Sequence, residues 1–173
     1  MSSADCCCAM WQSPIQAAIR PAVWLPGIRN LHSKKETWII PDATPEVCLE
    51  NLVSAVALLG EREKMHIHKA SNNKCSKIHK VRPNRNFVQI YSYTEFEWLD
   101  IVEIEFQPGQ ERGTLGKAHS FSTGVLPLMI PLAFLLNMVF FFVPFYDNNF
   151  NTMRLERIRC AMKLNIEIAK DHP

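Results

Sequence analysis

A histidine, two serines and a carboxylate are the residues whose types could support covalent catalysis. Ser120 or Ser122 could act as nucleophile, His119 as general base, and Asp100 or Asp147 as the group that orients the base. Adjacent residues of a strand point to opposite faces, which works against a direct pair between His119 and Ser120. The sequence also lacks a Gly-x-Ser-x-Gly elbow, a phosphate-binding glycine loop and a zincin motif. A small hydrolase-like enzyme is therefore the alternative function, and a non-enzymatic protein is favoured.

Four side chains between positions 66 and 79 could bind a metal ion. On a strand, His66 and His68 would share one face, and Cys75 and His79 could approach from the next segment. Their spacing matches no zinc signature, and the sequence contains no Cys-x-x-Cys pair. Surface histidines among lysines are the simpler interpretation, so neither a metal nor another cofactor is expected.

Basic and acidic residues form two separate blocks, although the net charge is only +2. Residues 64–85 hold seven basic residues and no acid, whereas residues 95–111 hold six acids and no base. Pairing between neighbouring strands would neutralise the two blocks. The alternative is that the basic block faces anionic lipid headgroups. Nucleic acid is not expected, because no DNA-reading helix or RNA-binding aromatic motif is present. The candidate contacts of this surface are Lys77, Lys80, Arg82 and Arg85.

The segment 125–145 reads VLPLMIPLAFLLNMVFFFVPF, and none of its residues is charged. About 20 apolar residues suffice for a helix to cross a bilayer, so a spanning helix is the default prediction. A hairpin that dips into one leaflet is the second possibility, and a buried core element is the third. Lipid is the expected partner of this insert. The residues predicted to contact it are Leu126, Phe134, Leu135, Leu136, Phe140, Phe141 and Phe142.

Residues 1–43 are predicted to form an N-terminal arm. Four prolines interrupt any long helix there, and the arm either packs on the domain or lies on a lipid surface. The absence of a secretory signal and the irregular spacing of the cysteines predict reduced thiols on the cytosolic side of a membrane. Cys6, Cys7 and Cys8 could accept palmitate, and an exposed chain start explains them equally well.

Residues 44–170 are predicted to form a single α+β domain that contains the insert. Its antiparallel sheet is flanked by an N-terminal and a C-terminal amphipathic helix. An apolar stripe after a capping threonine predicts the first helix at 45–59, ended by Gly60. A second stripe predicts the last helix at 151–170. Alternating and β-branched residues predict strands at 65–69, 77–81, 87–96, 99–106 and 115–123.

From Thr44 to about Lys163, the order of elements resembles domain of unknown function 1499, an uncharacterised family of bacterial and plant proteins. Residues 99–104 are similar to that family's VDDVEF strand, and residues 119–124 to its RSASR-x-G segment. Residues 147–156, DNNFNTMRLE, are similar to its closing DLGVN-x-x-RIE segment. The arginines around the family's Ser-x-Ser pair are replaced here by histidine and threonine, and Thr152 stands where a further arginine follows the asparagine. An anion site built from those arginines is therefore not implied.

The closing segment suggests a binding site of a different composition. Asn151 and Arg154 lie one helical turn apart and could hold an anionic group at a helix start. Helix capping and a surface arginine explain them equally well. The full set of candidate binding residues is Ser120, Ser122, Asp147, Asn151 and Arg154.

The position of the insert limits how the chain can meet a membrane. In the family pattern, the Ser-x-Ser strand runs almost directly into the closing segment, whereas residues 125–146 interrupt that junction here. If both flanks belong to one folded unit, they lie on the same side of a membrane, which favours the hairpin over the spanning helix. The sequence thus predicts a membrane-associated, non-enzymatic domain that faces the cytosol and binds lipid headgroups or a protein partner.

Overall fold

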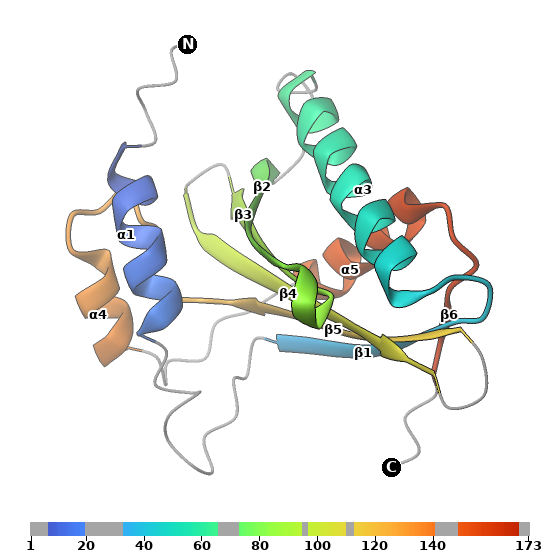
Figure 1. The fold of residues 1–173 in the computed structure, drawn as a ribbon. Coiled ribbons are helices and arrows are strands. Elements are labelled where there is room, and N and C mark those ends of the chain that lie inside the picture. Colours follow the sequence, from blue (N-terminus) through green and yellow to red (C-terminus); the bar gives the residue numbers. More distant parts are fainter. Residues whose placement is uncertain are drawn as a thin grey trace.

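The computed structural model describes residues 7–19, 33–65, 73–94, 97–109, 113–140 and 149–169. Its centre is a six-stranded antiparallel sheet with the strand order β2-β3-β4-β5-β1-β6 (Figure 1). The strands are β1 (Ser33–Ile40), β2 (Asn73–Arg82), β3 (Phe87–Thr94), β4 (Leu99–Pro108), β5 (Thr114–Ser122) and β6 (Glu167–Ile168). The helices are α1 (Cys7–Ala18), α3 (Pro45–Met65), α4 (Ala133–Val139) and α5 (Phe150–Met162), with the 3-10 helix η1 (Pro83–Arg85) between β2 and β3. The predicted α+β class with an antiparallel sheet is confirmed.

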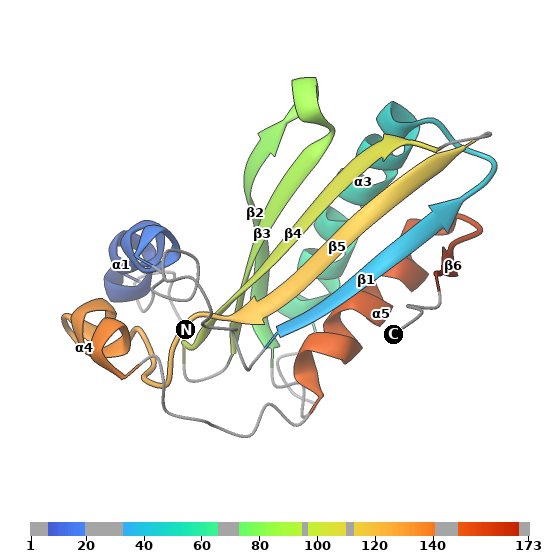
Figure 2. The same ribbon diagram turned by 90° about the horizontal axis from the view of Figure 1, so that it is seen from below.

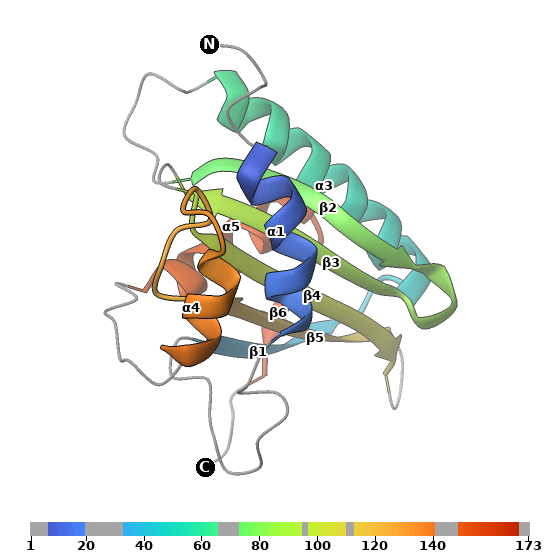
Figure 3. The same cartoon turned by 90° about the vertical axis from the view of Figure 1, so that its left-hand side faces the viewer.

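Helices cover both faces of the sheet, but at different places. The helices α3 and α5 pack along one face, as Figures 1 and 2 show. The helices α1 and α4 lie together across the opposite face, at one end of the strands (Figure 3). Because side chains alternate along each strand, the two faces carry separate cores. We call the face under α3 and α5 the helix face, and the other the open face.

The main core lies between the helix face and α3 with α5. Leu52 of α3 is fully buried there, together with Trp38 of β1 and with Ile104 and Phe106 of β4. Leu49, Leu52 and Val56 recur along one side of α3, which is the apolar stripe that the sequence predicts. A smaller second core on the open face gathers Tyr91, Tyr93, Ile101 and Phe121 with apolar residues of α1, α4 and the loop before α4.

Three predicted boundaries are wrong, and each has a physical reason. Gly60 does not end the first helix, which continues to Met65. A side chain at Gly60 would place its Cβ 3.1 Å from the carbonyl oxygen of Ser76, so the glycine lets α3 approach β2 closely. The predicted arm contains β1, which lies inside the sheet between β5 and β6. The last helix ends at Met162, where Lys163 adopts a left-handed conformation, and the short strand β6 follows.

The prediction of a single helix over 125–145 is also wrong. Residues 125–132 form an irregular loop, and α4 has only seven residues, about 10 Å of helix against about 30 Å of bilayer core. Within the described part of the chain, no helix combines the length and the apolar character that crossing a membrane requires. Residues 125–140 of the insert are described, and its helix α4 packs beside α1. Residues 141–145 lie outside the described residues, and the leaflet hairpin stays a prediction.

Replacing Leu52 with alanine is expected to lower the free energy of unfolding by about 2–5 kcal/mol, because the change leaves a cavity in the main core. Urea denaturation measures the loss. Leu58→Ala on the same helix is the matched control, since Leu58 is half exposed and its truncation should cost less than about 1 kcal/mol. Equal losses in the two variants would contradict the packing of α3 described above.

Candidate functional site

A row of polar side chains crosses the helix face of the sheet near one end. Ser76, Ser92, Asp100 and Ser122 occupy facing register positions on β2, β3, β4 and β5. The hydroxyl oxygens of Ser76 and Ser92 lie 3.3 Å apart, within hydrogen-bond distance. Ser92 is fully buried and Asp100 nearly so. Polar groups at such positions are costly unless they are paired, so their presence calls for a partner.

Arg154 of α5 supplies that partner. Arg154 Nη2 donates a hydrogen bond to Asp100 Oδ2 at 2.6 Å, and the two side chains form an ion pair. Nη1 donates to Asn151 Oδ1 at 3.1 Å and to Ser120 Oγ at 3.3 Å, while the Ser120 hydroxyl donates to Asn151 Oδ1 at 2.6 Å. We call these four residues the Arg154 cluster. The cluster contains residues from each of the three segments that resemble domain of unknown function 1499, which are residues 99–104, 119–124 and 147–156.

The Arg154 cluster fixes α5 to the sheet across the insert. Arg154 is only 6% exposed, and Ser120 is fully buried. Ser120 precedes the insert in sequence and Arg154 follows it, so both flanks belong to one folded unit. Breaking a buried ion pair by removing one partner costs far more than losing an exposed pair, because the remaining charge is left without compensation.

The residues proposed for catalysis are not assembled into a nucleophile and base. His119 points to the open face beside Glu103 in the register, whereas Ser120 points to the helix face. Among the described residues, the Ser120 hydroxyl donates to the amide oxygen of Asn151, which cannot take its proton. Ser122 is half-buried and faces Asp100 in the register. The predicted hydrolase-like arrangement therefore lacks its proton acceptor at Ser120.

A small cavity adjoins the Arg154 cluster under α3. Its volume is about 20 Å³, enough for one water-sized group. Arg154 Nε is buried and has no hydrogen-bond partner among the described residues. The lining is apolar apart from two serines and two arginines: Val56, Leu59, Ser76, Ile90, Ser92, Val102, Arg154, Arg157 and Ile158.

The second candidate site is an exposed apolar surface on α1, α4 and the loop before α4. Nine of the fifteen large apolar side chains that are exposed in the described residues lie there, although these elements form a small part of the chain. The largest patches on monomeric proteins are often functional. We call this set the α1–α4 surface: Trp11, Met129, Ile130, Leu132, Leu135, Leu136, Met138, Val139 and Phe140.

The helix α4 is turned with its apolar side outward. Asn137, its one polar residue, is 2% exposed, while Leu135 is 43% and Val139 57% exposed. The Asn137 amide accepts a hydrogen bond from the Leu126 backbone N–H at 2.8 Å and donates to the Leu126 carbonyl at 3.0 Å. A Cβ at Gly124 would come within 2.2 Å of the Asn137 side chain, so this position requires glycine. A helix in contact with water alone would show the opposite arrangement.

The helix α1 is held in the same way, with polar groups inward. Gln12 Nε2 donates to the carbonyls of Leu128 and Ile130, at 2.9 and 3.1 Å, and Gln16 Nε2 donates to that of Thr123 at 2.7 Å. Outside, the Trp11 ring meets Phe134 edge-on, with centroids 6.1 Å apart. Interior amides thus fix the positions of both helices while their larger apolar groups remain exposed.

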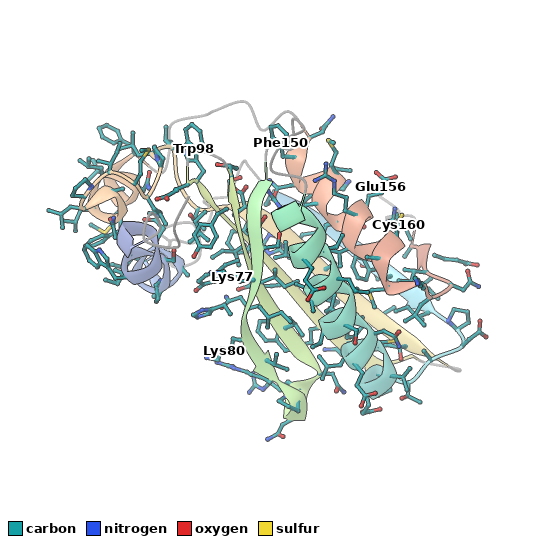
Figure 4. All side chains as sticks on the ribbon, turned by 90° about the horizontal axis from the view of Figure 1, so that it is seen from above. Lys77, Lys80, Trp98, Phe150, Glu156 and Cys160 are labelled. Carbon is teal, nitrogen blue, oxygen red and sulfur yellow. The ribbon has the colours of Figure 1, made fainter. Side chains whose placement is uncertain are left out.

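The open face carries the basic residues that the sequence singled out. Lys77, Lys80 and Arg82 on β2 form a basic strip, and Figure 4 shows Lys77 and Lys80 extending toward the side on which α1 and α4 lie. Lys77 pairs in register with Tyr91 of the second core, so the strip borders the α1–α4 layer. The strand β3 separates β2 from the acidic β4, where Glu103 instead accepts a hydrogen bond from Gln89. Arg85 is exposed in η1.

The histidines do not form a metal site in the part of the chain that is described. No group of three or more His, Cys, Asp or Glu side chains in it could hold a metal ion. His79 stacks on Tyr91 with ring centroids 4.0 Å apart. Partial burial, and then the charge of Lys80, lowers the pKa of His79. His66, His68 and the side chain of Cys75 lie outside the described residues.

The remaining predicted residues fall into two groups. Leu126 and Phe134 are half-buried, whereas Leu135, Leu136 and Phe140 are exposed on the α1–α4 surface. Phe141, Phe142, Asp147, Cys6 and the side chains of Cys7 and Cys8 lie outside the described residues, and palmitoylation stays a prediction.

Sequence reasoning missed Ser76, Ser92 and the inward amides of α1. A serine between Tyr91 and Tyr93 on a strand with Val88 and Ile90 was the available signal for Ser92.

Asp100→Ala is expected to lower the free energy of unfolding by about 3–5 kcal/mol, because Arg154 then keeps a buried charge without its anionic partner. Urea denaturation provides the measurement. The double variant Asp100→Leu with Arg154→Met should recover much of the loss, since it removes both charges. A loss below about 1 kcal/mol in the single variant would mean that the pair behaves as an exposed one.

Asn137→Ala is expected to accelerate hydrogen exchange at the Leu126 amide by about tenfold to a hundredfold, because that N–H loses its acceptor. Exchange followed by NMR reports on this single amide. Asn51→Ala removes an exposed amide hydrogen bond to the Val47 carbonyl and should leave Leu126 unchanged. Unaltered exchange in Asn137→Ala would show that the amide does not hold α4 in place.

Comparison with known proteins assigns no family. No family model matches the chain, and no curated protein matches it. Among solved structures, the crystal structure of Ara h 8.0201 is similar, with 10% sequence identity, a TM-score of 0.45, and coverage of 76% of this chain and 94% of that chain. This similarity is too weak to support a function, and the resemblance to domain of unknown function 1499 stays a prediction.

Proposed function

We propose that this protein is a peripheral membrane module that binds an anionic lipid surface through the α1–α4 surface and the neighbouring basic strip. The outward apolar side of α4 is the observation that carries the proposal. In an ordinary amphipathic helix the polar side chain would face water, whereas Asn137 of α4 points inward and pairs with the Leu126 backbone. The chain places small and polar groups inside and large apolar groups outside, as suits an element whose outer side enters lipid.

The apolar contribution suits shallow insertion. Complete burial of one large apolar side chain is worth about 1.5–3 kcal/mol. The nine residues of the α1–α4 surface are each roughly half exposed, so lipid can cover part of that area at several positions at once. An interfacial helix sinks about 5–10 Å, to the boundary between headgroups and acyl chains, and tryptophan is favoured at this depth. Trp11, which is half exposed on the α1–α4 surface beside Phe134, fits this arrangement.

The electrostatic contribution comes from the same side of the molecule. Lysines and arginines near an anionic leaflet add about 1 kcal/mol each. The basic strip lies on an edge strand, and its side chains are exposed on the open face. Lys35 and Lys117 share this face, and the acidic residues that oppose them among the described strand residues are Glu103, Glu105 and Glu167. An anionic surface therefore complements this side better than a neutral one.

Removing apolar area from α4 is expected to weaken liposome binding. The variant Leu135→Ser with Leu136→Ser should bind phosphatidylserine-containing vesicles at least about tenfold more weakly in a flotation assay, because two side chains no longer enter lipid. The matched control is Val47→Ser with Leu58→Ser, which removes similarly exposed apolar groups from α3 on the other side of the sheet. If both double variants bind vesicles as well as the unaltered chain does, lipid does not cover the α1–α4 surface. The same conclusion follows if the serine substitutions on α4 change only the association of the chain with itself.

Removing charge from β2 is expected to weaken binding to anionic vesicles only. Lys77→Gln with Lys80→Gln should cost about 2 kcal/mol at low salt, roughly thirtyfold in affinity, and should leave binding to purely zwitterionic vesicles unchanged. Lys34→Gln with Lys163→Asn removes the same charge elsewhere, because Lys34 faces the helix side and Lys163 follows α5. If both double variants weaken vesicle binding equally, binding depends on the net charge of the chain and not on the position of Lys77 and Lys80.

A further inference from the structure

The cavity under α3 has the composition of a small ligand site, and we infer that it binds the carboxylate of a small monocarboxylic acid. This site is separate from the proposed lipid surface, because it lies on the helix face of the sheet whereas the α1–α4 surface lies on the open face.

The recognition group is the guanidinium of Arg154. Its Nη2 is committed to Asp100 and its Nη1 to Ser120 and Asn151, but Nε is buried without a partner among the described residues. Such an orphaned donor is costly in an interior. Since Arg154 lines the cavity and is more than nine-tenths buried, an acceptor placed in the cavity would satisfy this donor. The Ser76 and Ser92 hydroxyls at the same cavity share one hydrogen bond, so one of the two keeps a hydrogen that it can donate to a ligand.

Charge and lining select the class of ligand. Two arginines line the cavity, and the adjacent Asp100 compensates one of them, which leaves an excess of one positive charge. A monoanion balances this excess, whereas a dianionic phosphate would exceed it. The other walls are apolar, from Val56 and Leu59 of α3 to Ile158 of α5, so the polar groups that an oxygen in the cavity can meet are those of the two arginines and the two serines.

The size of the cavity sets the binding mode. A volume of about 20 Å³ holds one oxygen atom but not a whole carboxylate with its tail. One carboxylate oxygen would therefore enter and accept from Arg154 Nε, and the second oxygen would face Arg157. Arg157 is exposed, so the outer part of the ligand remains near water. The acid comes from solution and not from a docked bilayer, because the sheet separates the cavity from the α1–α4 surface.

Titration of the uniformly ¹⁵N-labelled chain with acetate, propionate and chloride tests this inference through the Arg154 side-chain Nε–H resonance. Acetate and propionate are both expected to shift that resonance saturably, and chloride at equal ionic strength is expected to leave it in place. Ser92→Thr adds a methyl group at the cavity and should raise the Kd of acetate by at least about tenfold. Arg157→Gln should raise it by roughly two- to fivefold, as expected for an exposed charge.

Two control measurements keep the outcome independent of folding and of lipid binding. Ser54→Thr on the exposed side of α3 should leave the Kd of acetate unchanged. Saturating acetate should also leave vesicle flotation unchanged, so a failure of one proposal is separable from a failure of the other. An Arg154 Nε–H resonance that stays fixed with both acids overturns the inference and leaves the cavity as a site for water. A resonance that moves equally with chloride also overturns it, because the cavity would then accept any small anion.

Discussion

The amide of Asn137 determines which side of α4 faces outward. By pairing with both backbone groups of Leu126, it occupies the interior position that a leucine of this helix would otherwise take. Buried backbone groups need partners, and here a side chain from the helix supplies them. Leu135, Leu136 and Val139, on other sides of α4, then remain between 42% and 57% exposed. Gly124 is part of the same constraint, since any larger residue would displace the amide.

The sheet separates two regions with opposite physical character. On the open face, inward amides hold α1 and α4 so that their apolar groups remain exposed beside a basic strip. On the helix face, the Arg154 cluster holds α5 against the strands and leaves one guanidinium donor at a small cavity. The ion pair joins residues on both sides of the insert. Consequently the segments before and after the insert form one folded domain.

The sequence predicted those elements whose pattern depends on local alternation. The strands β4 and β5 and the stripe of α3 followed from spacing alone, because one of their sides meets a continuous core. It also named Asp100, Ser120, Asn151 and Arg154, which the fold assembles. The strand β1 was missed because prolines flank it in a segment of mixed composition. Composition gave no means of predicting that the one amide in an apolar run would point inward, because that depends on Leu126, eleven residues away.

Direct evidence on the central claim would come from the depth of α4 in a bilayer. A spin label at Leu136→Cys, in a chain whose other cysteines except the buried Cys48 are replaced by serine, reports accessibility to oxygen and to a water-soluble nickel complex. Burial raises the pKa of the Cys48 thiol and keeps it from labelling. On anionic vesicles the label at 136 should gain oxygen accessibility and lose nickel accessibility, whereas a label at Leu58→Cys should keep its solution values. Nickel accessibility at 136 that stays as high as in free solution, with the protein bound to the vesicles, would contradict the account.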